Sequence, residues 1–143
     1  MNNNPLYRKT EAILYNYNKV KAQIKNIELD IENIKNEFNG PGAIVYEERT
    51  QSTNSFNSSV ENEVVNREIE INQLERYKRQ KEIELLKVDN AIGSLTEREK
   101  IIIEMRYFKK NNNRMIAAKL NLAEEHICRI KNSAVNQILD SIF

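Results

Sequence analysis

Residues 115–135 read MIAAKLNLAEEHICRIKNSAV, and this stretch decides how the C-terminal part of the chain folds. Two segments with a helical spacing of apolar residues flank a short break at residues 121–123. Asn121 stands where a helix commonly ends in the left-handed conformation, because asparagine is the usual substitute for glycine at that position. The sequence therefore predicts a short helix over 114–120, a tight turn, and a longer helix from about 124 to 142.

The longer predicted helix has two chemically different faces. At 100° per residue, apolar side chains fall on one side, at Ile127, Ile130, Ala134 and Ile138. Polar side chains fall on the opposite side, at Glu125, Arg129, Asn132 and Asn136. These residue types hydrogen-bond to base edges in the major groove, Arg to guanine, Asn to adenine and Glu to cytosine. The pattern predicts a helix–turn–helix whose second helix reads double-stranded DNA through these four polar residues.

A basic segment precedes that helix. Between Met105 and Ala123 the chain carries five basic residues and no acidic one. Residues 95–143 hold nine Lys or Arg and six Asp or Glu, a net charge of +3, whereas residues 1–94 hold 13 and 15, a net charge of −2. Cations beside a reading helix supply phosphate contacts, which give affinity without sequence choice. The predicted phosphate-binding residues are Lys109, Lys110, Arg114, Lys119 and His126.

A capping box formed by Thr96 and Glu99 predicts another helix start just upstream. The helix that it opens carries four apolar side chains that we expect to form a buried stripe: Ile101, Ile102, Met105 and Phe108. The sequence KKNNN at 109–113 breaks this pattern and predicts a loop before the short helix.

The N-terminal part carries a long heptad pattern, in which steps of three and four residues alternate. Its members are Leu6, Thr10, Ile13, Tyr17, Val20, Ile24, Ile27, Ile31, Ile34 and Phe38. Pro5 suits the first helical turn, and the sequence NGPG at 39–42 ends the pattern. One continuous helix over about 5–38 is predicted, and its single apolar face requires a partner helix.

A second, weaker heptad pattern follows a polar segment. Ser58 and Glu61 have the spacing of a capping box, which predicts a loop over about 39–58, with a short extended piece at 43–48, before the helix begins. The second pattern comprises Val60, Val64, Arg67, Ile71, Leu74, Lys78, Lys81, Leu85, Val88 and Ile92. The matched lengths favour an antiparallel hairpin within one chain. Pairing with a second chain, or a four-helix dimer, is the alternative.

The predicted architecture is all-α, with a coiled-coil helical hairpin over 1–93 and a helix–turn–helix domain over 94–143. Only three glycines occur in the 143 residues, and they form no phosphate-binding loop. No apolar run is long enough to span a membrane, and the single cysteine fits a reducing cytoplasm. One His and one Cys are too few for a zinc site. We therefore expect no enzyme activity, no cofactor and no metal.

Two stretches of the C-terminal part resemble domain four of bacterial sigma factors, which reads the −35 promoter element. They are LTEREKIIIEMRYF at 95–108 and IAAKLNLAEEHICRIKNSAVNQIL at 116–139, and the resemblance covers about residues 94–140. Around the reading helix the matching residues are Glu125, Ile127, Ile130 and Ala134. The residues that depart from the sigma pattern are Glu124, Cys128 and Arg129, at positions where sigma factors contact bases and phosphates.

The layout of the whole chain is similar to small phage-encoded regulators of the ArpU and RinA type. These share a helical N-terminal half, a segment like Ser58–Glu61, and a C-terminal sigma-like helix–turn–helix. The resemblance implies activation of phage late genes in the cytoplasm of a bacterial host, together with host RNA polymerase. Promoter DNA is the expected partner, and a homodimer through the coiled coil is a further expectation.

Two other functions fit the same sequence features. A small terminase-like subunit would use the helix–turn–helix to recognise phage DNA for packaging, and its long helices would build a ring. A coiled-coil adaptor would bind protein alone, without DNA. The basic segment without acids argues against the adaptor.

Overall fold

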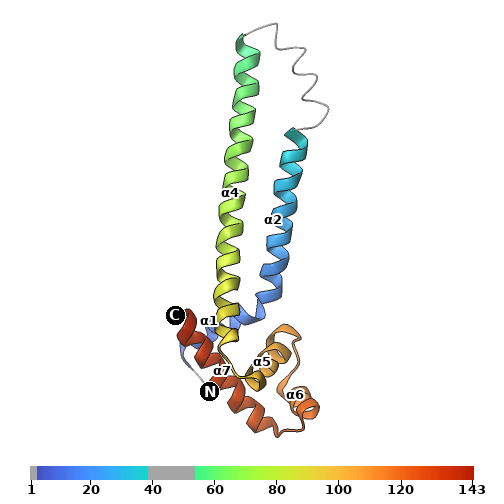
Figure 1. Cartoon of the computed structure of the whole chain (residues 1–143), viewed down its shortest axis with the longest axis vertical. Helices are drawn as coiled ribbons and strands as arrows, with labels where there is room; N and C mark the ends of the chain where they lie inside the picture. Colours follow the sequence, from blue (N-terminus) through green and yellow to red (C-terminus); the bar gives the residue numbers. More distant parts are fainter. Residues whose placement is uncertain (1–2, 39–53) are drawn as a thin grey trace. The chain divides into compact units, whose positions relative to one another are not determined.

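The described part of the chain is built from helices alone. The structure is a computed structural model that describes residues 3–38 and 54–143. In these ranges the helices follow one another along the chain without a β-strand (Figure 1). The prediction of an all-α fold is confirmed for these residues.

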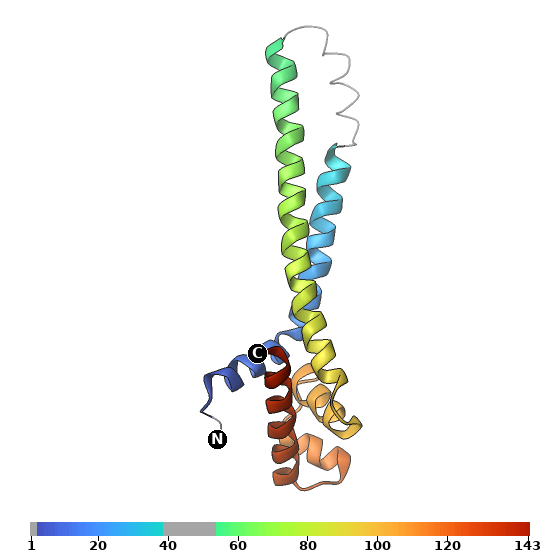
Figure 2. The ribbon, with the colours of Figure 1, turned by 60° about the vertical axis from the view of Figure 1, so that its left-hand side comes forward.

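The prediction of a single helix over 5–38 is wrong, because the helix is interrupted at Asn16. Helix α1 covers Pro5–Tyr15 and helix α2 covers Tyr17–Phe38. Asn16 has φ −89° and ψ 0°, outside the helical range, and the ribbon bends between α1 and the first turn of α2 (Figure 2). The reason is tertiary: α1 packs against α7 and η1.

The bend changes which side chains of α1 are buried. Tyr7, Thr10 and Leu14 are buried, while Leu6 of the predicted stripe is 37% exposed. Thr10 is the one polar residue among them, and its hydroxyl donates to the Leu6 carbonyl at 2.8 Å. In α1 the fully buried residues therefore share only Thr10 with the heptad pattern, and burial follows the pattern again from Tyr17 at the start of α2.

Helix α4 covers Asn54–Gly93 and starts earlier than predicted. Its helical conformation runs through Ser58, so the capping box with Glu61 does not mark a helix start. Such a box is a local preference that a continuing helix can override. The rest of the predicted loop, with the extended piece at 43–48, lies outside the described residues.

The structure divides into two units. The helix-pair unit covers Ala22–Glu82, and the main unit covers Met1–Lys21 and Ile83–Phe143. This division differs from the boundary predicted between residues 93 and 94. Residues 1–21 and the end of α4 group with the C-terminal helices because they share one core with them.

In the helix-pair unit, α2 runs antiparallel to α4 (Figure 1). On α2, Ile24, Ile27 and Ile31 are buried. Glu28 Oε1 of α2 lies 3.4 Å from Lys78 Nζ of α4. The members of the second heptad pattern within 64–81 are half-buried, whereas Val65 and Ile69 outside it are about half exposed, at 51% and 49%.

The main unit adds four short elements to α1 and the end of α4. They are α5 at Glu97–Ile103, the π-helix η1 at Glu104–Phe108, α6 at Asn113–Leu120 and α7 at Glu124–Ile142. One core cluster joins α1, α4, η1 and α7 through Leu14, Val88, Tyr107, Val135 and Ile138. A second cluster joins α5, η1, α6 and α7.

The stripe predicted for residues 101–108 is partly wrong. Ile102 and Met105 are buried as predicted, but Ile101 is 43% exposed, while Ile103 and Tyr107 are fully buried. A π-helix closes its turns with bonds between residues five apart, here from Lys109 N to the Glu104 carbonyl at 2.9 Å. These wider turns change the spacing of inward side chains, which a 3.6-residue period does not anticipate.

Candidate nucleic-acid interface

A side-chain cap and a left-handed residue define the two ends of α6 and the start of the turn into α7. Asn112 caps α6, because its Oδ1 accepts a hydrogen bond from Met115 N at 2.8 Å. Asn121 ends α6 with φ 55° and ψ 43°, so the predicted left-handed conformation is confirmed. Leu122 N then donates to the Ala117 carbonyl at 3.1 Å, which closes the turn. At Ala123 the cap of α7 has no side-chain hydrogen bond.

A small apolar cluster holds α7 against α5 and α6. Ile102, Ile116 and Ile127 are fully buried in it, and Ala117 is 8% exposed. Leu120, Leu122 and Ile130 cover its edge. The inward face predicted for residues 124–142 is confirmed here by Ile127 in the cluster and Ile130 at its edge, and the small side chain of Ala117 belongs to the same cluster. The opposite face of α7 is thereby directed away from this cluster.

The first two turns of α7 expose two of the four predicted base-reading residues. Glu125 and Arg129 have side chains 90% and 77% exposed, and Arg129 Nη2 lies 3.8 Å from Glu125 Oε2. An exposed ion pair one helical turn apart contributes at most about 0.5 kcal/mol. Both side chains can therefore exchange this contact for another partner. Asn136, two turns from Arg129, is also exposed.

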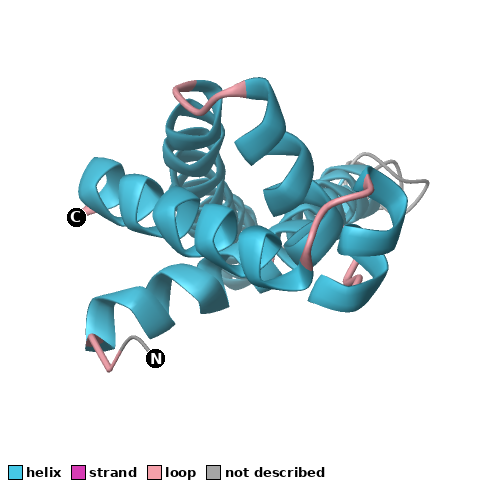
Figure 3. Cartoon of the chain, turned by 90° about the horizontal axis from the view of Figure 1, so that it is seen from below, coloured by secondary structure: helices cyan, strands magenta, loops and turns pink. Residues whose placement is uncertain are grey.

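Asn132, the remaining predicted reading residue, is engaged by the N-terminal helix. The Tyr7 hydroxyl donates to Asn132 Oδ1 at 2.7 Å, and Asn132 Nδ2 points to Cys128 Sγ at 3.7 Å. Bidentate recognition of adenine uses both amide atoms of asparagine. In this structure Oδ1 instead serves the contact between α1 and α7, while Nδ2 faces Cys128 one turn away on α7 itself. Helices α1 and α7 lie side by side at the labelled chain ends in Figure 3.

A second polar contact fastens α1 to the same side of α7. Glu11 Oε1 accepts a hydrogen bond from the Tyr107 hydroxyl at 2.8 Å and lies 3.8 Å from Lys131 Nζ. The Lys131 side chain is only 12% exposed, so solvent screens this pair less than a surface pair. Burial raises the pKa of Tyr7 to about 12 and raises the pKa of Tyr107 well above its ordinary value. Both phenols therefore stay protonated as hydrogen-bond donors.

A shallow hollow lies between α1 and α7 at these contacts. Its lining comprises Asn3, Tyr7, Arg8, Glu11, Cys128, Lys131 and Asn132. The sequence pattern does not reveal this surface, because it joins distant parts of the chain, such as Tyr7 and Asn132, which are 125 positions apart. The only signal was local: Tyr7 and Glu11 lie one helical turn apart on α1 and therefore share a face.

All five predicted phosphate-binding residues are exposed. Lys109 and Lys110 follow η1, Arg114 and Lys119 belong to α6, and His126 belongs to the first turn of α7. Helical spacing places Arg114 and Lys119 on opposite flanks of the buried face of α6. The five residues are therefore spread over the segment after η1, two flanks of α6 and the first turn of α7 rather than forming one row.

The segment between η1 and α6 holds backbone strain and unsatisfied polar atoms. Lys110 has φ 57°, and the left-handed region costs a non-glycine residue about 1 kcal/mol. Among the described residues, three buried side-chain polar atoms lack a hydrogen-bond partner, and all lie within 106–113: Arg106 Nε, Asn111 Nδ2 and Asn113 Oδ1. Strain of this kind concentrates at functional segments.

Residues 3–38 and 54–143 contain neither a membrane-spanning helix nor a cluster of metal-binding side chains. None of their helices combines the length and the apolar composition that crossing a bilayer requires. Their His, Cys, Asp and Glu side chains form no group of three that could hold a metal ion.

The fold and this surface define an all-α protein in which an exposed polar helix face adjoins a set of surface cations. The chain belongs to the family described as Protein of unknown function (DUF722), whose model matches residues 6–140. No curated protein matches the chain significantly, and no solved structure does so.

Proposed function

We propose that this protein is a sequence-specific DNA-binding regulator of transcription. In this proposal α6 and α7 form a helix–turn–helix, and α2 and α4 form a coiled-coil hairpin. The observation that carries it is the exposed pair Glu125 and Arg129 on the first turns of α7, directly after the tight turn. Helices of this type present their N-terminal residues to base edges in the major groove.

The surrounding charge supports duplex DNA as the ligand. Residues 106–122 carry five basic side chains and no acidic one, and four of these five side chains are exposed. Phosphate contacts of this kind position a reading helix without choosing the sequence. Glu125, Arg129 and Asn136 then supply base contacts, while Asn132 acts through its contact with Tyr7.

The biological role follows from the resemblance of residues 94–140 to sigma domain four. On that basis we infer activation of phage late genes together with host RNA polymerase. Glu124, Cys128 and Arg129 depart from the sigma pattern, so the recognised sequence differs from the −35 element. The long helices α2 and α4 carry the contacts to protein partners, because their unit is acidic and unsuited to DNA.

The test is a binding selection with duplex fragments of the encoding genome. Fluorescence anisotropy is measured at two salt concentrations, and the bound fragments are sequenced. We expect enrichment of one promoter-proximal site whose binding persists at the higher salt concentration. Weak binding to every fragment that disappears with salt would contradict the proposal and favour a protein adaptor.

A further inference from the structure

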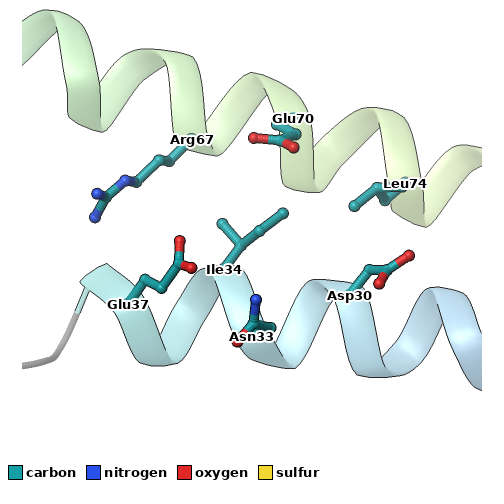
Figure 4. A pocket seen from close by; sticks show the side chains of 7 residues that line it. All are labelled: Asp30, Asn33, Ile34, Glu37, Arg67, Glu70 and Leu74. Atoms are coloured by element: carbon teal, nitrogen blue, oxygen red, sulfur yellow. The ribbon is translucent and has the colours of Figure 1, made fainter.

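The helix-pair unit contains a groove between α2 and α4 that the DNA-binding proposal does not use. Figure 4 shows side chains from both helices converging on it. The lining comprises Asp30, Asn33, Ile34, Glu37, Arg67, Glu70 and Leu74. Its volume is about 380 Å³.

Apolar side chains between the two helices are incompletely covered along this groove. Ile24, Ile27 and Ile31 are buried where α2 meets α4, but Ile34 and Leu74 are only half-buried at the groove. In Figure 4, Ile34 points from α2 towards α4 and Leu74 points back from α4. Covering such side chains with another apolar surface is favourable at about 25 cal/mol per Å².

Acidic side chains dominate the surface around the groove. Asp30, Glu37 and Glu70 belong to its lining, against one basic residue, Arg67. Residues 22–38 and 61–75 together hold nine acidic and three basic side chains, a net charge of −6. This field repels DNA phosphates and attracts cations. It also repels the same surface on a second copy of the chain.

We propose that this groove binds a lysine- and arginine-rich amphipathic helix of a partner protein. An apolar strip between acidic walls matches a helix that carries leucine-type residues on one face and cations on both flanks. The charges steer the encounter and select against acidic partners, while the apolar strip supplies the contact area. The proposal concerns residues 22–82 and does not depend on DNA binding by α7.

The test uses the full chain and a fluorescein-labelled model peptide of about 18 residues, which makes five helical turns. The peptide carries leucine on one face and lysine elsewhere, and a second peptide replaces every lysine with glutamate. We expect saturable one-to-one binding of the lysine peptide, measured by fluorescence anisotropy, and no binding of the glutamate peptide. Equal binding of both peptides would overturn the proposal, because the contact would then be unspecific and apolar.

Matched variants distinguish an effect of the carboxylates in the groove from an effect of the overall negative charge. The groove variant combines Asp30→Asn, Glu37→Gln and Glu70→Gln, and the control combines Glu32→Gln, Glu61→Gln and Glu68→Gln on the outer faces of the same helices. Both change the net charge by +3. We expect about tenfold weaker peptide binding for the groove variant, since three weak charge contacts are lost, and about twofold for the control. Equal weakening in both would overturn the proposal.

Three further measurements complete the design. Circular dichroism of both variants establishes that the helices persist. Sedimentation of the free chain detects self-association, and a dimer that the lysine peptide dissociates would overturn the proposal, because the groove would then belong to a second copy. Genomic DNA binding by the groove variant is measured in parallel. Unchanged DNA binding together with about tenfold weaker peptide binding is the expected result, and it keeps the two proposals separate.

Discussion

The hydroxyl of Tyr7 donates a hydrogen bond of 2.7 Å to Oδ1 of Asn132. This contact joins the first and last helices of the main unit across 125 positions of the sequence. Tyr7 is 5% exposed and Asn132 is half-buried, so the bond is partly shielded from water. It fixes α1 beside α7 and limits the freely exposed polar face of α7 to the side that carries Glu125, Arg129 and Asn136.

Removing the Tyr7 hydroxyl should therefore destabilise the main unit. We expect Tyr7→Phe to lower the free energy of unfolding by about 1 kcal/mol, because Asn132 Oδ1 loses its donor. Urea unfolding followed by circular dichroism measures the change. Tyr77→Phe on α4 is the matched control, since Tyr77 is 46% exposed, and it should change stability by less than about 0.5 kcal/mol.

The double variant Tyr7→Phe with Asn132→Leu tests whether the two residues act as a pair. Replacing both polar partners by apolar groups costs less than removing one, so the effects should be non-additive by about 0.5 kcal/mol or more. Strict additivity of the two single changes would contradict a direct bond between them.

Alkaline pH should weaken the fold through the same tyrosines. Burial raises the pKa of Tyr7 to about 12 and, with the Asp89 contact, that of Tyr17 to about 12, from an ordinary value of 10.0. Between about pH 10 and 12 the folded state binds more protons than the unfolded state, so the free energy of unfolding falls as pH rises. The contribution is complete below pH 10.

Urea unfolding at several pH values between 9 and about 11.5 measures this slope. Because lysines also titrate in that range, the informative quantity is the difference between variants. We expect Tyr7→Phe and Tyr17→Phe each to reduce the slope, and Tyr77→Phe to leave it unchanged. An identical slope in all four proteins would show that these phenols do not resist ionisation.

Some of this architecture was accessible to sequence analysis and some was not, for physical reasons. The turn at Asn121, the cap at Thr96 and the inward face of α7 depend on signals within one or two helical turns, and these predictions are confirmed. The bend at Asn16 depends on a docking surface that the distant residues of α7 provide. A heptad pattern that continues through the bend cannot reveal it. The shielding of Asn132 was missed for the same reason.

The left-handed turn between α6 and α7 gives a further prediction. Asn121 has φ 55°, where a side chain with a Cβ costs about 1 kcal/mol and a β-branched one costs more. We expect Asn121→Gly to keep or slightly raise the free energy of unfolding, and Asn121→Val to lower it by about 2 kcal/mol. Thermal and urea unfolding measure both. Equal stability of the two variants would contradict the left-handed assignment.

The prediction that bears most directly on function is that substitutions of Arg129 and Lys119 weaken DNA binding in different ways. Arg129 is 77% exposed on the polar face of α7, and under the proposed function only a weak pair with Glu125 must be released before Arg129 contacts a base. We expect Arg129→Ala to cost about 1–3 kcal/mol on the preferred duplex and to relax the choice of base at one position. Lys119→Ala should instead weaken all duplexes similarly and lower the slope of log affinity against log salt by about 0.9.

Both variants are compared by fluorescence anisotropy on the enriched duplex, on single-base variants of it and on an unrelated duplex. Lys35→Ala on α2 is the control for a change of one positive charge, and it should leave every affinity within about twofold, because Lys35 lies in the acidic helix-pair unit. An equal loss on every duplex for Arg129→Ala would remove its role as a base reader and place it among the phosphate contacts. In that case sequence choice would rest on Glu125 and Asn136 alone.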